Sequence, residues 1–403
     1  MLAIFGGEPV KKTEFMSWPV TKELDKELLL ETIRSGKWSN GSKKAEFEAR
    51  FAADCDVKHV FAVANGTVSL ELILRGLGIG YGDEVILPPY TFVATLSSIV
   101  FAGATPVFAD IDRGTYDISP ASVEEKITPN TKAIVAVAIG GCPPDLDALT
   151  EIAQKYNVKL IVDAAQGVGA IWNGKSICAY GDAASISCQN SKNLTSGEGG
   201  IITTNHDELA AAIAQMLRGG YVEDENGERV YTTVGQDQNI SEFQASLLLS
   251  QYDKLYAEMA VREKNAAYLA GRMKPMEFAH AMNYDDRIDR HAYHLFVIRL
   301  DSEKFAEKGI TREQFIKALN AEGIPLSVGY NPLYTFPCIT VPYTEELIGT
   351  KITVENLPES ELAAYKEGTW LYQACLLGTR EDMDMIADAM IKVWEHADEI
   401  KGL

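Results

Sequence analysis

Apolar residues recur along the chain with two spacings, which predict helices and strands that take turns. Apolar residues three to four positions apart predict helices over residues 22–35, 43–53, 67–76, 92–102, 120–126 and 145–156. Short, nearly continuous apolar runs predict strands over residues 60–64, 84–87, 106–109, 133–138 and 159–162. Because these strands are apolar on both sides, the alternation indicates an α/β fold with a mostly parallel sheet that helices cover on both faces.

The later part of the chain predicts a second, smaller unit. A long helical pattern over residues 241–273 leads to a strand at 293–300 and to helices at 312–321 and 380–397. The length of 403 residues agrees with more than one domain, since a single core rarely serves a chain this long. We predict a large α/β domain over residues 1–250 and a small α+β domain over residues 251–403.

Composition and charge exclude several classes of partner. The net charge of -20 argues against binding nucleic acid or an anionic membrane surface, because both require a basic patch. No apolar run is long enough to span a membrane, and the N-terminus lacks the pattern of a signal peptide. The six cysteines are scattered without Cys-x-x-Cys spacing, which is typical of reduced thiols. We predict a cytoplasmic protein without a metal site.

A polar, glycine-rich loop places a lysine between two predicted strands. Residues 187–200 separate the apolar runs 183–187 and 201–204, and Lys192 lies among small polar residues of this loop. An amine held in a partly desolvated pocket becomes nucleophilic and can form a Schiff base. The alternative is an ordinary exposed lysine. We interpret Lys192 as a candidate catalytic residue.

Two other strand ends carry polar residues, at the edge of the sheet where ligands usually bind. Gly66 and Thr67 open a helix after the first of these strands, where free N–H groups favour a phosphate. Asn65 or Thr67 can also cap that helix, and the two roles are compatible. Asp163 ends a buried strand, where a carboxylate is costly without a positive partner. A protonated ring nitrogen fits better than a dinucleotide ribose, because no Gly-x-Gly-x-x-Gly fingerprint precedes Asp163.

One motif matches a nucleotide-binding pattern without its structural context. Residues 169–176 satisfy the Walker A expression, and this motif requires a strand before the loop and a helix after it. Asn173-Gly174 is instead a strong tight-turn pair, and another strand follows. We interpret this stretch as a hairpin with an incidental match.

The ordered motifs resemble those of the DegT-type sugar aminotransferases, which are fold-type I pyridoxal-phosphate enzymes. The likeness covers nearly the whole chain. It rests on Asn65-Gly-Thr-Val-Ser-Leu, Tyr90-Thr-Phe-Val-Ala-Thr, Asp163-Ala-Ala-Gln and Ser187-Cys-Gln-Asn-Ser-Lys-Asn-Leu-Thr-Ser-Gly-Glu-Gly-Gly. The resemblance implies the fold-type I architecture, with a large α/β/α domain and a smaller C-terminal domain, and pyridoxal 5'-phosphate as cofactor.

The resemblance also implies a role for each matching residue. Lys192 would hold the cofactor as a Schiff base and move the substrate proton, and Asp163 would pair with the protonated pyridine nitrogen. The remaining cofactor contacts would come from Gly66, Thr67 and Ser187 at the phosphate, Phe92 on the ring face, and Gln166 at the ring or its hydroxyl. Phe92 can equally be an aromatic residue of the core.

Three residues of the second domain match family positions that approach the substrate: His294, Tyr330 and Tyr334. Packing and turn formation are the alternative roles for all three, and for the two tyrosines they carry equal weight. Hydroxyl and imidazole groups suit a polyhydroxylated ring, because each ring hydroxyl needs a partner once it is desolvated. No added basic cluster suits a nucleotide diphosphate.

The family's segment at residues 235–239 reaches into the partner subunit, which implies a homodimer with shared active sites. Here Asp237 stands where the family has Asn, and Asn239 stands where it has Arg. A carboxylate beside a phosphate dianion is unfavourable, so the cofactor contact has two candidates, Asp237 and Asn239. Cys188 and Gln189 replace the family's usual Phe-His and alter the pocket wall.

The function that the resemblance implies is transfer of an amino group from glutamine or glutamate to a keto-cyclitol, of the scyllo-inosose type, or to a keto-sugar. Amination of a nucleotide-linked keto-sugar is the first alternative. A sugar dehydratase is a second, but in dehydratases that resemble this family a histidine replaces the lysine found here as Lys192. A non-catalytic protein that binds the cofactor is a third.

Overall fold

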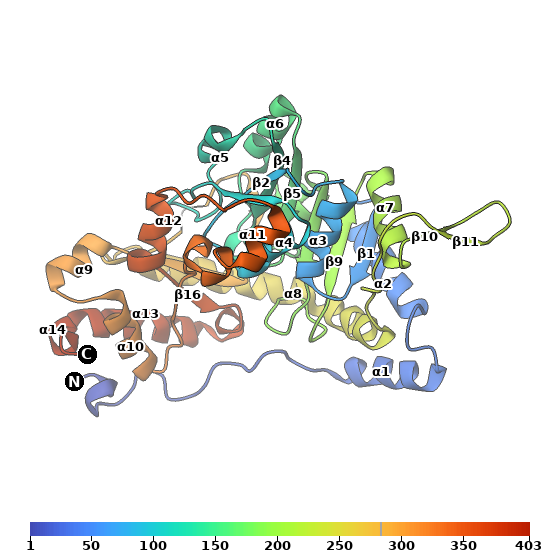
Figure 1. Ribbon diagram of the computed structural model, residues 1–403. Helices are drawn as coiled ribbons and strands as arrows, with labels where there is room; N and C mark the ends of the chain where they lie inside the picture. The colour runs from blue at the N-terminus through green and yellow to red at the C-terminus, as the bar shows by residue number, and fades with distance from the viewer. Residues whose placement is uncertain (283) are drawn as a thin grey trace.

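The computed structural model describes residues 1–282 and 284–403, and a seven-stranded sheet forms its largest unit (Figure 1). In spatial order the strands are β1 (His59–Val63), β9 (Gly200–Thr204), β8 (Ala183–Ser187), β5 (Lys159–Asp163), β4 (Thr131–Val137), β2 (Glu84–Leu87) and β3 (Thr105–Phe108). Strands β8, β5, β4, β2 and β3 pair in parallel, whereas β9 is antiparallel to both β1 and β8. The prediction of an α/β fold with a mostly parallel sheet is confirmed.

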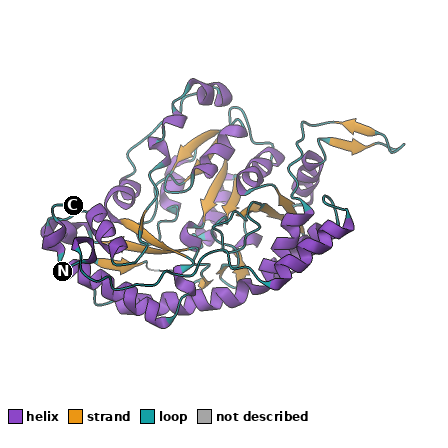
Figure 2. Cartoon of the chain, turned by 90° about the horizontal axis from the view of Figure 1, so that it is seen from below, coloured by secondary structure: helices purple, strands orange, loops and turns teal. Residues whose placement is uncertain are grey.

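Successive residues of one strand enter two different cores, because strand side chains alternate between the faces of a sheet. Ile161 of β5 packs in the core beneath α3 (Gly66–Gly76) and α4 (Val93–Phe101). Its neighbour Val162 packs in the core beneath α2 (Ser42–Cys55) and α8 (Glu242–Met273). The other helices of this unit are α1 (Glu23–Ser35), α5 (Pro120–Lys126), α6 (Leu146–Tyr156) and α7 (Asp207–Leu217). Figure 2 shows helices around the strands of the large sheet.

A four-stranded antiparallel sheet organises the second unit. Its strands, in spatial order, are β12 (Ala279–Ala281), β14 (Leu295–Leu300), β16 (Gly368–Tyr372) and β15 (Ser327–Val328). The helices of this later part of the chain are α9 (Ser302–Lys308), α10 (Arg312–Ala321), α11 (Pro342–Ile348), α12 (Pro358–Leu362), α13 (Arg380–Glu395) and α14 (Ala397–Ile400). Leu2, the second residue of the chain, is fully buried in the core of this unit. The smaller α+β unit is therefore confirmed.

Helix α8 joins the two units. It contacts α1 and α2 in the first unit and α13 and β12 in the second. The division expected at residue 250 lies inside this helix and stays a prediction. Within the described part of the chain, no helix has the length and apolar character that crossing a bilayer requires.

The stretch that matches the Walker A expression is a hairpin, as predicted. Strands β6 (Ile171–Trp172) and β7 (Lys175–Ser176) pair antiparallel, and β13 (Ile288–Arg290) extends this small sheet along β6. The turn residues Asn173 and Gly174 have φ angles of 48° and 76°, the left-handed conformation that a two-residue hairpin turn requires. The next element is a short 3₁₀ helix, so the loop lacks the helix start that would bind phosphate.

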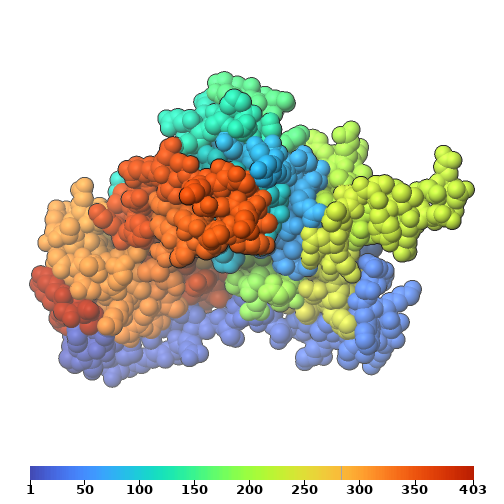
Figure 3. All heavy atoms as spheres, in the orientation of Figure 1, coloured from blue at the N-terminus to red at the C-terminus, as the bar shows by residue number. Residues whose placement is uncertain are grey.

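A second hairpin extends from the body of the molecule. Strands β10 (Tyr221–Glu223) and β11 (Arg229–Tyr231) pair only with each other among the described strands. Figures 1 and 3 show this yellow-green segment projecting away from the rest of the chain. Tyr231 is 67% exposed, and Val222 and Val230 are also exposed. Such an arm leaves apolar side chains without cover from its own subunit.

Candidate active site

A cavity of about 750 Å³ opens where the carboxyl ends of β1, β5 and β8 meet. This position follows the rule for parallel sheets, in which ligands bind beyond the carboxyl ends of the strands. The cavity brings together most of the residues that the sequence singled out: Gly66, Thr67, Phe92, Asp163, Gln166, Ser187, Lys192, His294 and Tyr330. Tyr334, Asp237 and Asn239 do not line it.

One wall of the cavity has the shape of a phosphate cradle. Asn65 caps α3, because its side-chain oxygen accepts a hydrogen bond of 2.9 Å from the N–H of Val68. A Cβ at Gly66 would lie 2.9 Å from the Cβ of Ser187, so only glycine lets the helix start approach the end of β8 this closely. The first N–H groups of α3 have no acceptors within the helix. Together with the Ser187 hydroxyl they fit a small anion.

Asp163 is a buried carboxylate at the end of β5. It is 4% exposed, and its oxygens accept hydrogen bonds of 2.9 Å from the Thr95 hydroxyl and 3.1 Å from the N–H of Ala165. Burial raises the pKa of this carboxyl, whereas the two hydrogen bonds and the nearby charge of Lys192 oppose that shift. A buried carboxylate gains from a positive partner in direct contact. A protonated ring nitrogen in the cavity fits this requirement.

Lys192 lines the cavity from a loop whose backbone is held by hydrogen bonds. The carbonyl of Cys188 accepts hydrogen bonds of 3.1 Å from both the Ser196 N–H and the Thr195 hydroxyl, which closes the loop. The Lys192 carbonyl accepts a hydrogen bond of 3.2 Å from the indole N–H of Trp18. Burial lowers the pKa of the Lys192 amine from 10.5 to about 8, against the opposing charge of Asp163. A larger neutral fraction near neutral pH is the property that a nucleophilic lysine needs.

Gln166, Tyr330 and His294 are held by hydrogen bonds at the inner wall. The side-chain oxygen of Gln166 accepts a bond of 2.7 Å from the Gly140 N–H, and its amide donates to the Tyr330 hydroxyl at 2.8 Å. His294 is buried, and its Nδ1 lies 3.2 Å from the side-chain oxygen of Asn193. Burial lowers the pKa of His294 well below 6.5, and the positive charges of Lys192 and Arg262 lower it further. His294 is therefore neutral at pH 7 and offers a hydrogen bond without a charge.

Phe92 precedes α4 at the rim of the cavity and is 57% exposed. The interpretation of Phe92 as a core aromatic is therefore wrong. An aromatic ring that lines a cavity without packing in the core is free to stack on a planar ligand.

Three predicted site residues lie elsewhere in this subunit. The Tyr334 hydroxyl lies 3.4 Å from a Glu361 oxygen, and its ring packs edge-on against Phe108. The amide of Asn239 donates to the Leu217 carbonyl at 3.1 Å and to an Asp237 oxygen at 3.3 Å. Both Asp237 and Asn239 follow the projecting β10–β11 hairpin in the chain. Their roles at the cofactor stay predictions.

Several residues that line the cavity or orient its groups were not singled out from the sequence. Thr95 donates a hydrogen bond to Asp163 and belongs to the motif that begins at Tyr90. It lies three residues after Phe92, a spacing that places two side chains on the same side of a helix. Asn193 directly follows Lys192 and orients His294. Tyr372 ends β16, lines the cavity and is 45% exposed. No local pattern marks Tyr372, because its position depends on how the second sheet meets the first.

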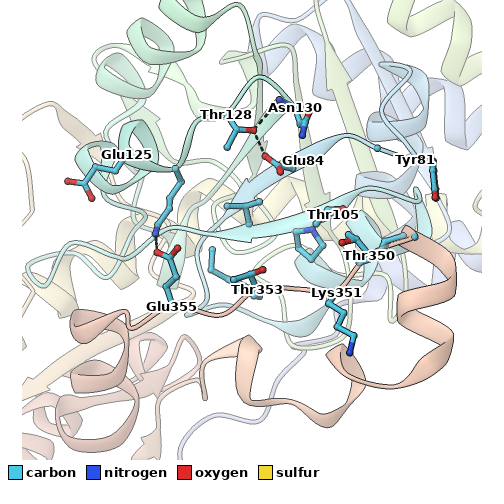
Figure 4. A pocket seen from close by; sticks show the side chains of 17 residues that line it. Tyr81, Glu84, Thr105, Glu125, Thr128, Asn130, Thr350, Lys351, Thr353 and Glu355 are labelled. Carbon is cyan, nitrogen blue, oxygen red and sulfur yellow. Dashed lines mark hydrogen bonds and ion pairs between the residues drawn. The ribbon is translucent and has the colours of Figure 1, made fainter.

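A different cavity, of about 790 Å³, lies along the edge strand β3 (Figure 4). It contains none of the predicted site residues. Two of its charged groups form an ion pair, Lys126 with Glu355, and a third, Glu84, accepts a hydrogen bond from the Thr128 hydroxyl. The smaller cavity at Lys192 is therefore the candidate active site, because its groups are buried and reactive.

Comparisons with known proteins identify a matching family and similar proteins over most of the chain. The profile of the DegT/DnrJ/EryC1/StrS aminotransferase family matches residues 19–390. The L-glutamine:2-deoxy-scyllo-inosose aminotransferase of Streptoalloteichus tenebrarius is 35% identical, over 100% of this chain and 99% of the relative. The GDP-perosamine synthase of Caulobacter vibrioides is 36% identical, over 75% of this chain and 80% of the relative. The X-ray structure of an aminotransferase from Psychrobacter cryohalolentis superposes with a TM-score of 0.87 at 27% identity, covering 95% of this chain and 100% of that one.

Proposed function

The chain belongs to the DegT/DnrJ/EryC1/StrS aminotransferase family and is an aminotransferase, and we propose that it aminates a free keto-cyclitol or a simple keto-sugar with pyridoxal 5'-phosphate as cofactor. Glutamine or glutamate is the proposed amino donor. The observation that carries the proposal is that Lys192, Asp163 and the phosphate cradle line one cavity. The proposed location is the cytoplasm, in keeping with six free cysteines.

The residues that line the cavity match the cofactor's phosphate, ring nitrogen and aldehyde carbon one by one. Gly66, Thr67 and Ser187 would hold its phosphate, Asp163 would face the proton on its ring nitrogen, and Lys192 would hold its aldehyde carbon. When bound, pyridoxal phosphate withdraws electrons from the carbon that bears the amino group and so makes its proton acidic. The Lys192 amine, once free, is the group placed to take that proton and return it.

The charge on the cavity wall supports an uncharged keto substrate. Among the described lining residues of this subunit, Lys192 is the one cationic side chain, and Glu71, Asp163 and Glu198 are acidic. Glu71 is paired with Arg75 at 3.1 Å, so a nucleotide diphosphate would bring its negative charge mainly toward the exposed carboxylate of Glu198. Tyr330, Gln189 and Tyr372 provide hydroxyl and amide groups that suit the hydroxyls of a cyclitol or sugar ring. The full-length likeness to the scyllo-inosose aminotransferase agrees with this choice.

Parallel assays on an inosose and on a nucleotide-linked keto-sugar, with glutamine as donor, test the substrate class. We expect kcat/KM for the inosose to be about 10- to 10³-fold higher, because like charges a few ångström apart repel by about 1–4 kcal/mol. Glu198→Gln should narrow this difference, since it removes one exposed carboxylate from the wall. Turnover of the nucleotide-linked sugar alone would refute the preference while leaving aminotransferase activity established.

The proposed catalytic unit is a homodimer with two shared active sites. The projecting β10–β11 hairpin supports this part of the proposal, because its apolar side chains need cover from a second subunit. Asp237 and Asn239 follow this hairpin and lie outside their own subunit's cavity. In a dimer with two-fold symmetry, the hairpin of each subunit would complete the active site of the other subunit, which gives two equivalent shared sites.

Mixing two inactive variants tests whether the sites are shared. One variant carries Lys192→Ala, and the other has residues 221–231 replaced by a short turn. If the hairpin serves the partner, random hybrids regain one working site each, about a quarter of wild-type activity in an equal mixture.

A mixture of Lys192→Ala with Asp163→Ala is the matched control, since both residues belong to the same subunit's cavity. This mixture should regain nothing. Hybrids that form, as shown by sedimentation of differently tagged subunits, yet stay inactive in the first mixture would disprove the shared site.

A further inference from the structure

A basic groove of about 580 Å³ lies at the junction of the two units, separate from the candidate active site. Arg113 comes from the loop after β3, Lys274 from the end of α8, His280 from β12 and Arg299 from β14. The groove shares no lining residue with the cavity that contains Lys192. The loop after β3 in the first unit and the small sheet of the second unit therefore contribute to a single concave surface.

The charge of this groove is opposite to that of the rest of the protein. The chain has 57 acidic residues against 37 basic ones, yet the described lining of this groove holds two arginines, a lysine and a histidine, with no carboxylate. The three other described cavities each have a glutamate in the wall, at Glu84, Glu198 and Glu14 respectively. A local concentration of cations on an acidic protein attracts anions to that point.

A buried carboxylate holds Arg113 in place and offsets only part of the positive charge of the groove. Glu367 is fully buried and accepts hydrogen bonds from Nη2 and Nε of Arg113 at 2.6 and 3.2 Å. Nη1 of Arg299 lies 3.9 Å from the same carboxylate, and no hydrogen bond to a described residue occupies this guanidinium. Lys274 has no ion-pair partner among the described residues.

Other carboxylates stand near the rim. A Glu359 oxygen lies 4.0 Å from Nε of Arg113, and an Asp301 oxygen lies 3.9 Å from Nε2 of His280. Both distances are at the limit of an ion pair, so these groups reduce the positive charge of the groove without removing it.

We propose that this groove binds a small phosphate-bearing anion, through Lys274 and Arg299 as the principal contacts and Arg113 at the rim. Arginine suits phosphate because its planar fork can donate two parallel hydrogen bonds, and lysine adds a point charge. The groove is larger than inorganic phosphate, so a phosphorylated metabolite fits it better than the free ion. A bound anion would link the loop after β3 to the small sheet and so connect the two units.

Binding of phosphate to the cofactor-saturated enzyme tests the proposal, because the cofactor then occupies the cradle at Gly66. Calorimetry at constant ionic strength, with inorganic phosphate and with glucose 6-phosphate as probes, should show one saturable site per chain. Lys274→Glu should weaken binding at least tenfold, and Arg299→Gln should weaken it in the same direction. Tighter binding of the ester would identify a phosphorylated metabolite as the source, and equal binding would identify free phosphate.

Lys264→Glu is the matched control. It makes the same charge change on α8, the helix that Lys274 directly follows, at an exposed position outside the groove. We expect this variant to bind either probe within twofold of wild type. If Lys264→Glu and Lys274→Glu weakened binding equally, the effect would come from the net charge of the protein, and the proposed site would be wrong. The absence of saturable binding to the wild-type enzyme would also disprove the site.

Discussion

Lys192→Ala is expected to lower turnover by more than about 10⁴-fold, because the variant loses both the covalent attachment point and the general base. The Lys192 side chain lines an open cavity and its amine accounts for no hydrogen bond of the fold, so the variant should stay folded. Weak cofactor binding should survive through Gly66, Thr67 and Ser187. Steady-state kinetics and cofactor absorbance measure the two effects separately.

Lys175→Ala is the matched control for this prediction. Lys175 is the lysine of the Walker A match, is exposed in the β6–β7 hairpin, and lies over the ring of Tyr180. Its removal should leave turnover unchanged. Borohydride reduction of the cofactor-loaded wild-type enzyme, followed by peptide mapping, should place the label on Lys192. A label on any other lysine would contradict the site assignment.

The elements that the sequence predicted best are those whose pattern is local and strong. The apolar strand Glu84–Leu87 and the helices Pro120–Lys126 and Arg312–Ala321 occupy the expected residues. The positions of such strands and helices along the chain follow mainly from the need to bury their apolar residues, which a local sequence pattern shows directly. The tight turn at Asn173-Gly174 was equally predictable, because its residues select a left-handed backbone.

The parts that the sequence left open depend on contacts far apart in the chain. Gln166 was expected at the cofactor, and its side chain is held between Gly140 and Tyr330, which the topology brings together. The β10–β11 hairpin has no core of its own, so no pattern of burial marked its direction. The basic groove combines a loop, a helix end and two strands, and single residues such as Lys274 give no signal of such a site.

Asp163→Asn is expected to lower turnover by roughly 10²- to 10⁴-fold, because removing one partner of a buried charge pair costs about 3–5 kcal/mol. The fold should tolerate the change. Burial raises the pKa of Asp163, which means that the charged carboxylate is unfavourable in the cofactor-free protein, and asparagine removes that charge at nearly constant volume. Thr95→Val is the control, since it removes a hydrogen bond to Asp163 and keeps the charge. We expect Thr95→Val to lower turnover by about tenfold.

Asp163→Asn should make the Lys192 amine more reactive, although it lowers turnover. The charge of Asp163 raises the pKa of Lys192, so Asp163→Asn should move that pKa below its value of about 8 and increase the neutral fraction at pH 7.5. Competitive acylation of the cofactor-free protein across pH, with Lys175 as internal reference, measures this shift. A more reactive lysine in a less active enzyme would show that Asp163 acts on the bound cofactor and not by activating Lys192. Loss of both reactivity and turnover would instead indicate that Asp163 positions the lysine.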